Sequence, residues 1–415
     1  MHGKHLFLII TAAFFAAFSL PAADELLTRS RNGDLNSQVK LATEYFYGKN
    51  RQKNIALSLY WFRKAAAAGS PYAQYNLALF LQNGWGTEVN SAAAFHFYAL
   101  AMDQKISKAA VRYAEMLFTG VEAGNYYELI LPEVKPDIPR ALQILRQTAR
   151  SGESEALLLL ARHLFANAPA HGRELRELLE KYCTSTENPD PEALVIYAAC
   201  LRSGIGGFVP DPPAGAKILR LAADRKHPEA MAQLAEMMIN GFGTPLDRQG
   251  ALKLYDEAIK LGSSRAMTDI AAFKQMGMYL PHDPAGAFEL LKSAGEKNYA
   301  PALKKLGDCY AYGIGTEKNT DRAMEFYQRA AARGSADAAF HLGICHRDGV
   351  MTPKNLTAAF GYFHRAALAG HPGAMRETGK ALLDGSGVPR NYAAGMEFIR
   401  AAAKAGDREA AEYLR

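Results

Sequence analysis

ALKKLGDCYAYGIGTEKNTDRAMEFYQRAAARGSAD, residues 302–337, contains the pattern that decides the fold of this chain. Its first alanine recurs every 36 residues, at Ala230, Ala266, Ala302, Ala338, Ala374 and Ala410. Glycine recurs at the same interval, at Gly241, Gly277, Gly313, Gly349 and Gly385. A fixed period of this length is typical of solenoids, in which each unit buries its apolar face only against its neighbours.

Aligned on this period, the chain divides into ten units. They begin near Ser37, Ala73, Ala109, Ala156, Ala193, Ala230, Ala266, Ala302, Ala338 and Ala374. The third unit, 109–155, is about eleven residues longer than the others, and its excess, 121–138, is rich in Gly, Pro and Tyr and predicts a surface loop. The fourth unit, 156–192, is degenerate and has Asn167 in place of glycine. We expect residues 24–36 to form a lead-in and 37–415 to form the solenoid.

Each unit predicts two helices. In the first, large residues four and eight places after the starting alanine, such as Leu306 and Tyr310, form one buried stripe. Glycine at the eleventh place, such as Gly313, ends this helix because it accepts the left-handed conformation of a C-terminal cap. The second helix carries an apolar stripe and ends near Gly334. The fold class is therefore all-α, a right-handed α/α superhelix of about ten helical hairpins.

These residues carry a resemblance to a known family. The segment 302–337 contains L-G-x-x-Y-x-x-G-x-G, then K/R-A-x-x-x-Y, then A-A-x-x-G. This segment resembles the Sel-one-like repeat (SLR) family, an α/α superhelical relative of the tetratricopeptide repeats. The resemblance extends over nearly all of residues 24–415. The resemblance implies a scaffold that assembles other proteins, often exported and often in signalling, quality control or envelope processes. It names no partner.

The N-terminus predicts export. Lys4 precedes an apolar run from Leu6 to Phe18, and this run is too short for a membrane helix, so we interpret residues 1–23 as a signal peptide cleaved near Ala22 or Ala23. No later segment is apolar enough to span a membrane. We expect a periplasmic location, with secretion from the cell as the alternative. The net charge is +6, from 48 basic and 42 acidic residues, and the interspersed signs predict no nucleic-acid partner.

Enzymatic chemistry has little support in the sequence. Ser37 and Lys40 form an S-x-x-K pattern that is similar to that of serine β-lactamases and penicillin-binding proteins, but no K-T-G accompanies it. This pair motivates an alternative function as a β-lactam-binding or cell-wall-related envelope enzyme. A zinc site can be built from His341, Cys345 and His346, although further ligands lack a fixed geometry. We therefore expect no catalytic residue, no cofactor and no metal.

The four cysteines leave one question open. Cys200, Cys309 and Cys345 all lie seven places after the start of their unit, where equivalent residues of neighbouring units are too far apart for a bridge. We interpret these three as buried apolar residues. Cys183 lies where cysteine-rich members of the resembled family place a bridging cysteine, although Ala193 or Leu194 fills the usual partner place. A disulfide between Cys183 and Cys200 stays an alternative.

Variation between units indicates a binding surface. By analogy with related superhelices, the places two, six and nine after each unit start face the concave side; we call them the variable row. Packing places repeat because each unit has the same neighbour geometry, whereas the variable row differs from unit to unit. The row supplies the candidate partner-binding residues Tyr75, Leu79, Gln82, Val111, Glu115, Phe118, Arg162, Phe165, Phe340, Ile344 and Arg347. The favoured function is an exported adaptor that binds a protein or peptide there.

Overall fold

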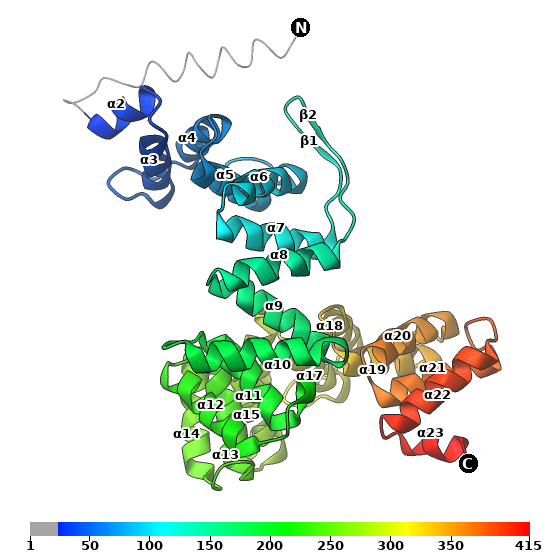
Figure 1. Cartoon of the computed structure of the whole chain (residues 1–415). Helices are drawn as coiled ribbons and strands as arrows, with labels where there is room; N and C mark the ends of the chain where they lie inside the picture. Colours follow the sequence, from blue (N-terminus) through cyan, green and yellow to red (C-terminus); the bar gives the residue numbers. More distant parts are fainter. Residues whose placement is uncertain (1–23) are drawn as a thin grey trace. The chain divides into compact units, whose positions relative to one another are not determined.

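The structure is a computed structural model in which residues 24–415 are described. The predicted signal peptide, residues 1–23, lies outside the described residues. The chain forms two compact units that divide between Asn167 and Ala168, and each is described by itself. Figure 1 shows that the described residues are helices joined in series, apart from one small hairpin of strands.

The first unit, residues 24–167, consists of helices and one two-stranded antiparallel sheet. Its elements are α2 (Glu25–Arg31), α3 (Leu35–Tyr47), α4 (Ile55–Ala67), α5 (Pro71–Asn83), α6 (Ser91–Asp103), α7 (Ser107–Thr119), β1 (Gly124–Tyr126), β2 (Leu129–Leu131), α8 (Ile138–Arg150) and α9 (Ser154–Ala166). Helices α3 with α4, α5 with α6, and α7 with α8 pack as successive hairpins.

The second unit, residues 168–415, continues with helical hairpins, apart from the longer α10 and the shorter η1 and α23. Its elements are α10 (Ala168–Ser185), α11 (Pro191–Ser203), the short 3-10 helix η1 (Ile205–Gly207), α12 (Pro212–Asp224), α13 (Pro228–Asn240), α14 (Arg248–Lys260), α15 (Ser264–Met276), α16 (Pro284–Glu296), α17 (Ala300–Tyr312), α18 (Thr320–Ala332), α19 (Ala336–Asp348), α20 (Leu356–Leu368), α21 (Pro372–Asp384), α22 (Tyr392–Lys404) and α23 (Arg408–Tyr413). The predicted all-α architecture of tandem helix-turn-helix repeats is confirmed.

Local capping sets the helix boundaries. First helices end at glycines in the left-handed conformation, as at Gly313 (φ 72°) and Gly349 (φ 72°), which confirms the predicted role of the eleventh place. Within the described residues, nine second helices begin at an Asn or Asp whose side chain accepts a backbone N–H of the first turn. These caps are Asn54, Asn90, Asp137, Asp211, Asp247, Asp283, Asn319, Asn355 and Asn391. Every such hairpin therefore carries its own start signal.

Small residues allow the two helices of a hairpin to approach closely. A Cβ atom added to Gly343 of α19 would lie 2.5 Å from ring atoms of Phe363 in α20. Gly307 of α17 meets the ring of Tyr327 in α18 at the same distance. Both aromatic rings are buried, so the glycines leave the space that these rings fill.

The insertion in the third repeat differs from the predicted loop. Residues 121–138 contain β1 and β2, which pair antiparallel with Asn125 opposite Ile130, and Val121 pairs with Val134 at the base of the hairpin. The Gly, Pro and Tyr content indicated a loop. The strands were not predicted because three residues are too few to show an alternating apolar and polar pattern.

All four cysteines are free thiols, so the alternative Cys183 to Cys200 disulfide is not formed. Cys200, Cys309 and Cys345 are buried, in agreement with their interpretation as apolar core residues. Burial raises the pKa of Cys183 and of Cys200 to about 12 each. At neutral pH both are therefore protonated thiols with low reactivity.

Candidate partner-binding surface

In the first unit, the variable row carries aromatic and amide side chains on α5. Tyr75 is half-buried, and its ring lies 6.0 Å from that of the buried Tyr98 on α6. The Tyr98 hydroxyl donates a hydrogen bond to Oε1 of Gln82, over 2.7 Å. Burial raises the pKa of Tyr98 far above its usual value, so this hydroxyl stays a donor. Tyr98 of α6 thus holds the Gln82 side chain of α5 in place.

An arginine joins the first helices of two repeats, α7 and α9. Arg112 lies on α7, three places after the unit start, and its Nη1 is 2.6 Å from Oε2 of Glu115 on the same helix. Its Nη2 is 2.5 Å from Oε1 of Glu155 on α9. Glu115, a predicted partner-binding residue, is therefore already paired.

Aromatic stacking continues along the row. Phe118 of α7 stacks on His163 of α9, with ring centroids 4.9 Å apart and an interplanar angle of 17°. The row also contains Leu79 and Phe165, which are half-buried, and Arg162, which is exposed. Partly covered apolar side chains with a charged margin are typical of protein contact sites.

Val111 is a correction to the predicted row. Its side chain is 0 % exposed, because α7 turns this place into the core of the first unit. Its neighbour Arg112 lies one place further along the helix and occupies the surface instead. Val111 therefore belongs to the core and is not a partner-binding residue.

In the second unit, a network of ion pairs joins the first helices of two repeats, α13 and α15. Arg265 lies in the first turn of α15. Its Nη1 is 3.3 Å from Oε1 of Glu229, and its Nη2 is 3.0 Å from Oε2 of Glu236, both on α13. Its Nε lies 3.8 Å from Asp269 on α15. Burial raises the pKa of Asp269 to about 6, although Arg265 opposes this shift. The Tyr255 hydroxyl completes the network at 3.3 Å from Asp269.

Three predicted residues of the ninth repeat lie on α19. Phe340 stacks on His371, with centroids 4.3 Å apart, and Ile344 is half-buried. Arg347 binds Glu377 of α21 at 2.8 Å and also contacts Asp348. Arg347 and Glu377 line a hollow of about 190 Å³ that is bordered by α19, α20 and α21. Arg347 thus borders a hollow that is lined by side chains of both charges.

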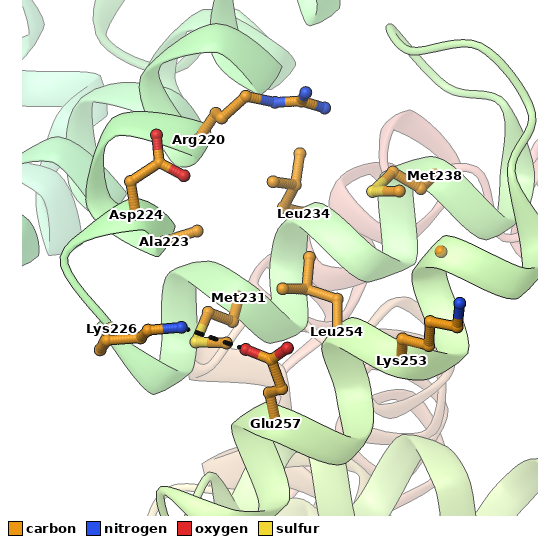
Figure 2. Close-up of a pocket in the computed structure, with 11 residues that line it drawn as sticks. Arg220, Ala223, Asp224, Lys226, Met231, Leu234, Met238, Lys253, Leu254 and Glu257 are labelled. Carbon is orange, nitrogen blue, oxygen red and sulfur yellow. Dashed lines mark hydrogen bonds and ion pairs between the residues drawn. The ribbon is translucent and has the colours of Figure 1, made fainter.

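A larger hollow, of about 410 Å³, lies between α12, α13 and α14. Figure 2 shows its apolar side chains between charged side chains of α12 and α14. Lys226 and Glu257 form an ion pair across it at 3.2 Å, drawn as a dashed line. The lining residues are Arg220, Ala223, Asp224, Lys226, Met231, Leu234, Met238, Gly250, Lys253, Leu254 and Glu257.

This hollow was not predicted from the sequence. Leu254 occupies a place of the second helix that holds Trp61, Phe326 or Tyr362 in other repeats. Gly250, four places earlier, has no side chain. The next repeat has the same two residue types, Gly286 and Leu290, so this pair alone does not single out the hollow.

Ser37, the serine of the enzymatic alternative, takes part in a helix cap. The Ser37 hydroxyl donates a hydrogen bond to Asp34, which caps α3. This bond lowers the pKa of Asp34 and leaves the hydroxyl oriented toward the cap, whereas Lys40 is exposed. Within residues 24–415, no three His, Cys, Asp or Glu side chains are grouped to hold a metal ion. His341 stacks on Tyr327, and His346 stacks on Tyr362.

Comparison with known proteins identifies the repeats. The Sel1 repeat family model matches nine segments, which are 35–70, 71–105, 107–153, 191–227, 228–263, 264–299, 300–335, 336–371 and 372–407. The fourth predicted unit falls in the gap that these matches leave, between 153 and 191. No helix of the described chain has the length and apolar character needed to span a membrane.

A curated relative and two solved structures are similar to this chain. An uncharacterized protein of Neisseria meningitidis serogroup B is 29 % identical over 258 residues, which is 58 % of this chain and 54 % of that protein. The chain thus spans about half the length of this relative. A protective antigen of uropathogenic Escherichia coli with an SLR fold aligns over 93 % of this chain and 88 % of its own, at 21 % identity and a TM-score of 0.51. A Sel1 repeat protein from Oxalobacter formigenes aligns over 60 % and 99 %, at 24 % identity and a TM-score of 0.48.

Proposed function

Because the chain belongs to the Sel1 repeat family, we propose that it is a scaffold whose variable row binds a protein or peptide partner. Sel1 repeats typically mediate protein interactions, and this coarser role is what the family supplies. The finer assignment rests on one observation: Tyr75, Leu79 and Phe118 are partly covered apolar side chains in a row shared by α5 and α7.

Neighbouring contacts hold this row in place before any partner arrives. Tyr98 fixes Gln82, Arg112 joins α7 to α9, and His163 supports Phe118. A surface that is ordered in advance loses less conformational entropy when it binds. Aromatic and arginine side chains of this kind contribute most of the energy in protein interfaces. The row therefore fits an extended or helical peptide with apolar side chains.

The proposal includes export to the periplasm, supported by the apolar N-terminal segment 6–18. The test is to express the full chain in a Gram-negative host and to sequence the N-terminus of the product from the periplasmic fraction. A product that begins near Ala22 or Ala23 supports export. A product that retains Met1 and stays in the cytoplasmic fraction contradicts it.

The partner-binding row is tested with residues 24–415 as bait in an envelope extract. Captured proteins are identified by mass spectrometry, and the affinity of the main one is then measured with variants. Tyr75→Glu and Phe118→Glu should each weaken binding by roughly tenfold or more, because a charge replaces a desolvated aromatic contact.

Tyr60→Glu is the matched control, since Tyr60 is an exposed tyrosine of α4 outside the row. It should leave the affinity unchanged, and all three variants should keep the helical circular dichroism of the parent. Equal affinity for the Tyr75→Glu and Tyr60→Glu proteins would remove the row as the binding surface. Labelling with a fluorescent penicillin tests the enzymatic alternative: a covalent adduct that Ser37→Ala abolishes would support it.

A further inference from the structure

The hairpin inserted in the third repeat is held in place along one edge. The side-chain Nδ2 of Asn90, the N-cap of α6, donates to the backbone oxygen of Asn125 over 2.7 Å. Tyr126 packs edge-on against Phe97 of α6, with ring centroids 5.3 Å apart. The Arg63 guanidinium lies 5.8 Å from the ring centroid of Tyr127 at the turn. The anchoring contacts thus come from β1 and from the turn.

The other edge of the hairpin carries no strand among the described residues, where the sheet has two strands. In a two-residue hairpin the pair that closes the turn, here Tyr126 and Leu129, exchanges ladder hydrogen bonds, and the next pair does not. The backbone groups of Asn125 and Ile130 therefore point outward. The bond from Asn90 to Asn125 agrees with this, and on β2 the equivalent outward groups belong to Ile130.

Side chains at this free edge define its chemistry. Ile130 is 86 % exposed and Leu129 is 47 % exposed, so the centre of β2 is apolar. The exposed Glu128 and Glu133 flank it on both sides. Figure 1 shows the hairpin projecting from the helices near α7 and α8.

We infer that the outer edge of β2 binds an extended peptide segment that has an apolar centre and basic residues at both ends, by adding a strand to the hairpin. Backbone N–H and C=O groups of Ile130 supply the strand pairing, and the two glutamates select the basic ends. A second copy of this chain fits less well, because edge-to-edge pairing would bring Glu128 and Glu133 of both copies together. The site is separate from the variable row.

The probe is a fluorescein-labelled peptide of eight residues, with alternating valine and isoleucine at the centre and two lysines at each end. Binding to residues 24–415 is followed by fluorescence anisotropy, and strand formation by the isotope-edited amide I band of the peptide. We expect saturable binding with a strand signal. A peptide with glutamates in place of the lysines should bind roughly tenfold more weakly.

Two variants of Ile130 separate the contribution of its backbone N–H from that of its side chain. Ile130→Pro removes the outward N–H without removing a bond to β1, and should weaken binding roughly tenfold or more. Ile130→Thr keeps the N–H and the strand preference, and should weaken it roughly threefold. Tyr75→Glu, in the variable row, should have no effect. The two Ile130 variants should retain the melting temperature of the parent.

Several outcomes would overturn the inference. Absence of binding would do so, as would equal binding by the Ile130→Pro, Ile130→Thr and parent proteins. Equal affinity for the glutamate-ended peptide would overturn the basic partner class. A dimer of the parent that Ile130→Pro converts to a monomer would assign the edge to a second copy instead. Because the probe does not use the variable row, loss of capture at Tyr75 and loss of peptide binding at Ile130 are distinguishable.

Discussion

The buried and exposed sides of the first helices follow different rules. In α17 and α19 three buried places hold the same residue types, Ala302, Leu306 and Cys309 in one helix and Ala338, Leu342 and Cys345 in the other. Two places of the variable row differ between the same helices, with the half-buried Lys304 and Asp308 in one and the half-buried Phe340 and Ile344 in the other. Residue types on the buried side are constrained because each repeat packs against its neighbours in the same way. The exposed side is free to acquire a partner.

The largest expected effect comes from breaking the buried side. Gly343→Leu places a side chain where a Cβ already lies 2.5 Å from the ring of Phe363, so α19 and α20 must separate. We expect a loss of about 3 kcal/mol in the free energy of unfolding, since overpacked cores force backbone shifts. Urea denaturation followed by circular dichroism measures it. Gly361→Leu is the matched control, because nothing lies within 4 Å of a Cβ at that exposed glycine of α20. Equal losses in the two variants would contradict close packing at Gly343.

A second prediction concerns the ion network on the exposed side. Arg265→Ala leaves Glu229, Glu236 and Asp269 without their shared cation. We expect a loss of about 2 kcal/mol at neutral pH, reduced from the value for a fully buried pair because these carboxylates are partly exposed. Arg112→Ala in the first unit removes the cation from two carboxylates and should cost about 1 kcal/mol. A larger loss for Arg112→Ala than for Arg265→Ala would reverse the comparison of the two networks.

The pH dependence of stability tests the role of Asp269 in this ion network. The pKa of Asp269 is raised to about 6 by burial, so the folded protein binds its proton more tightly than the unfolded chain does. Stability should therefore fall as pH rises from about 4 to about 6, by about 1.5 kcal/mol from this residue. The measurement is the midpoint of urea denaturation across this range, for the parent and for Asp269→Asn. The variant should lack this part of the slope. Parallel curves would show that Asp269 does not titrate there.

The smallest effect is expected at a helix position that contacts neither a neighbour nor the variable row. Gly361 of α20 is exposed and has open space around it. Gly361→Ala should raise the free energy of unfolding by about 0.7 kcal/mol, because alanine loses less backbone entropy in a helix. A destabilised Gly361→Ala protein, seen as a lower thermal midpoint, would mean that this glycine has a contact role.

The period of 36 residues was enough to predict the helical hairpins, because it repeats both the buried stripe and the glycine caps. It did not predict the hairpin of β1 and β2, whose strands are three residues long. The burial of Val111 was also missed, since a place in the row does not by itself decide exposure. Sequence spacing alone does not report how far each helix is rotated.

The ion network was missed for a different reason, although the sequence contains a sign of it. Glu229 and Arg265 occupy the same place in consecutive repeats, 36 residues apart, and carry opposite charges. Opposite charges one period apart predict an ion pair between neighbouring helices. Arg347 and Glu377 are 30 residues apart and occupy different places, so no single rule of spacing finds every such pair.

The Asn and Asp caps of the second helices have a consequence for how the chain folds and unfolds. Each cap acts within its own helix, so a hairpin can begin to form without waiting for distant segments. Loss of structure on heating should then spread from repeat to repeat, with intermediate species. Amide hydrogen exchange should accordingly give a graded profile along the chain, with each hairpin opening at its own free energy.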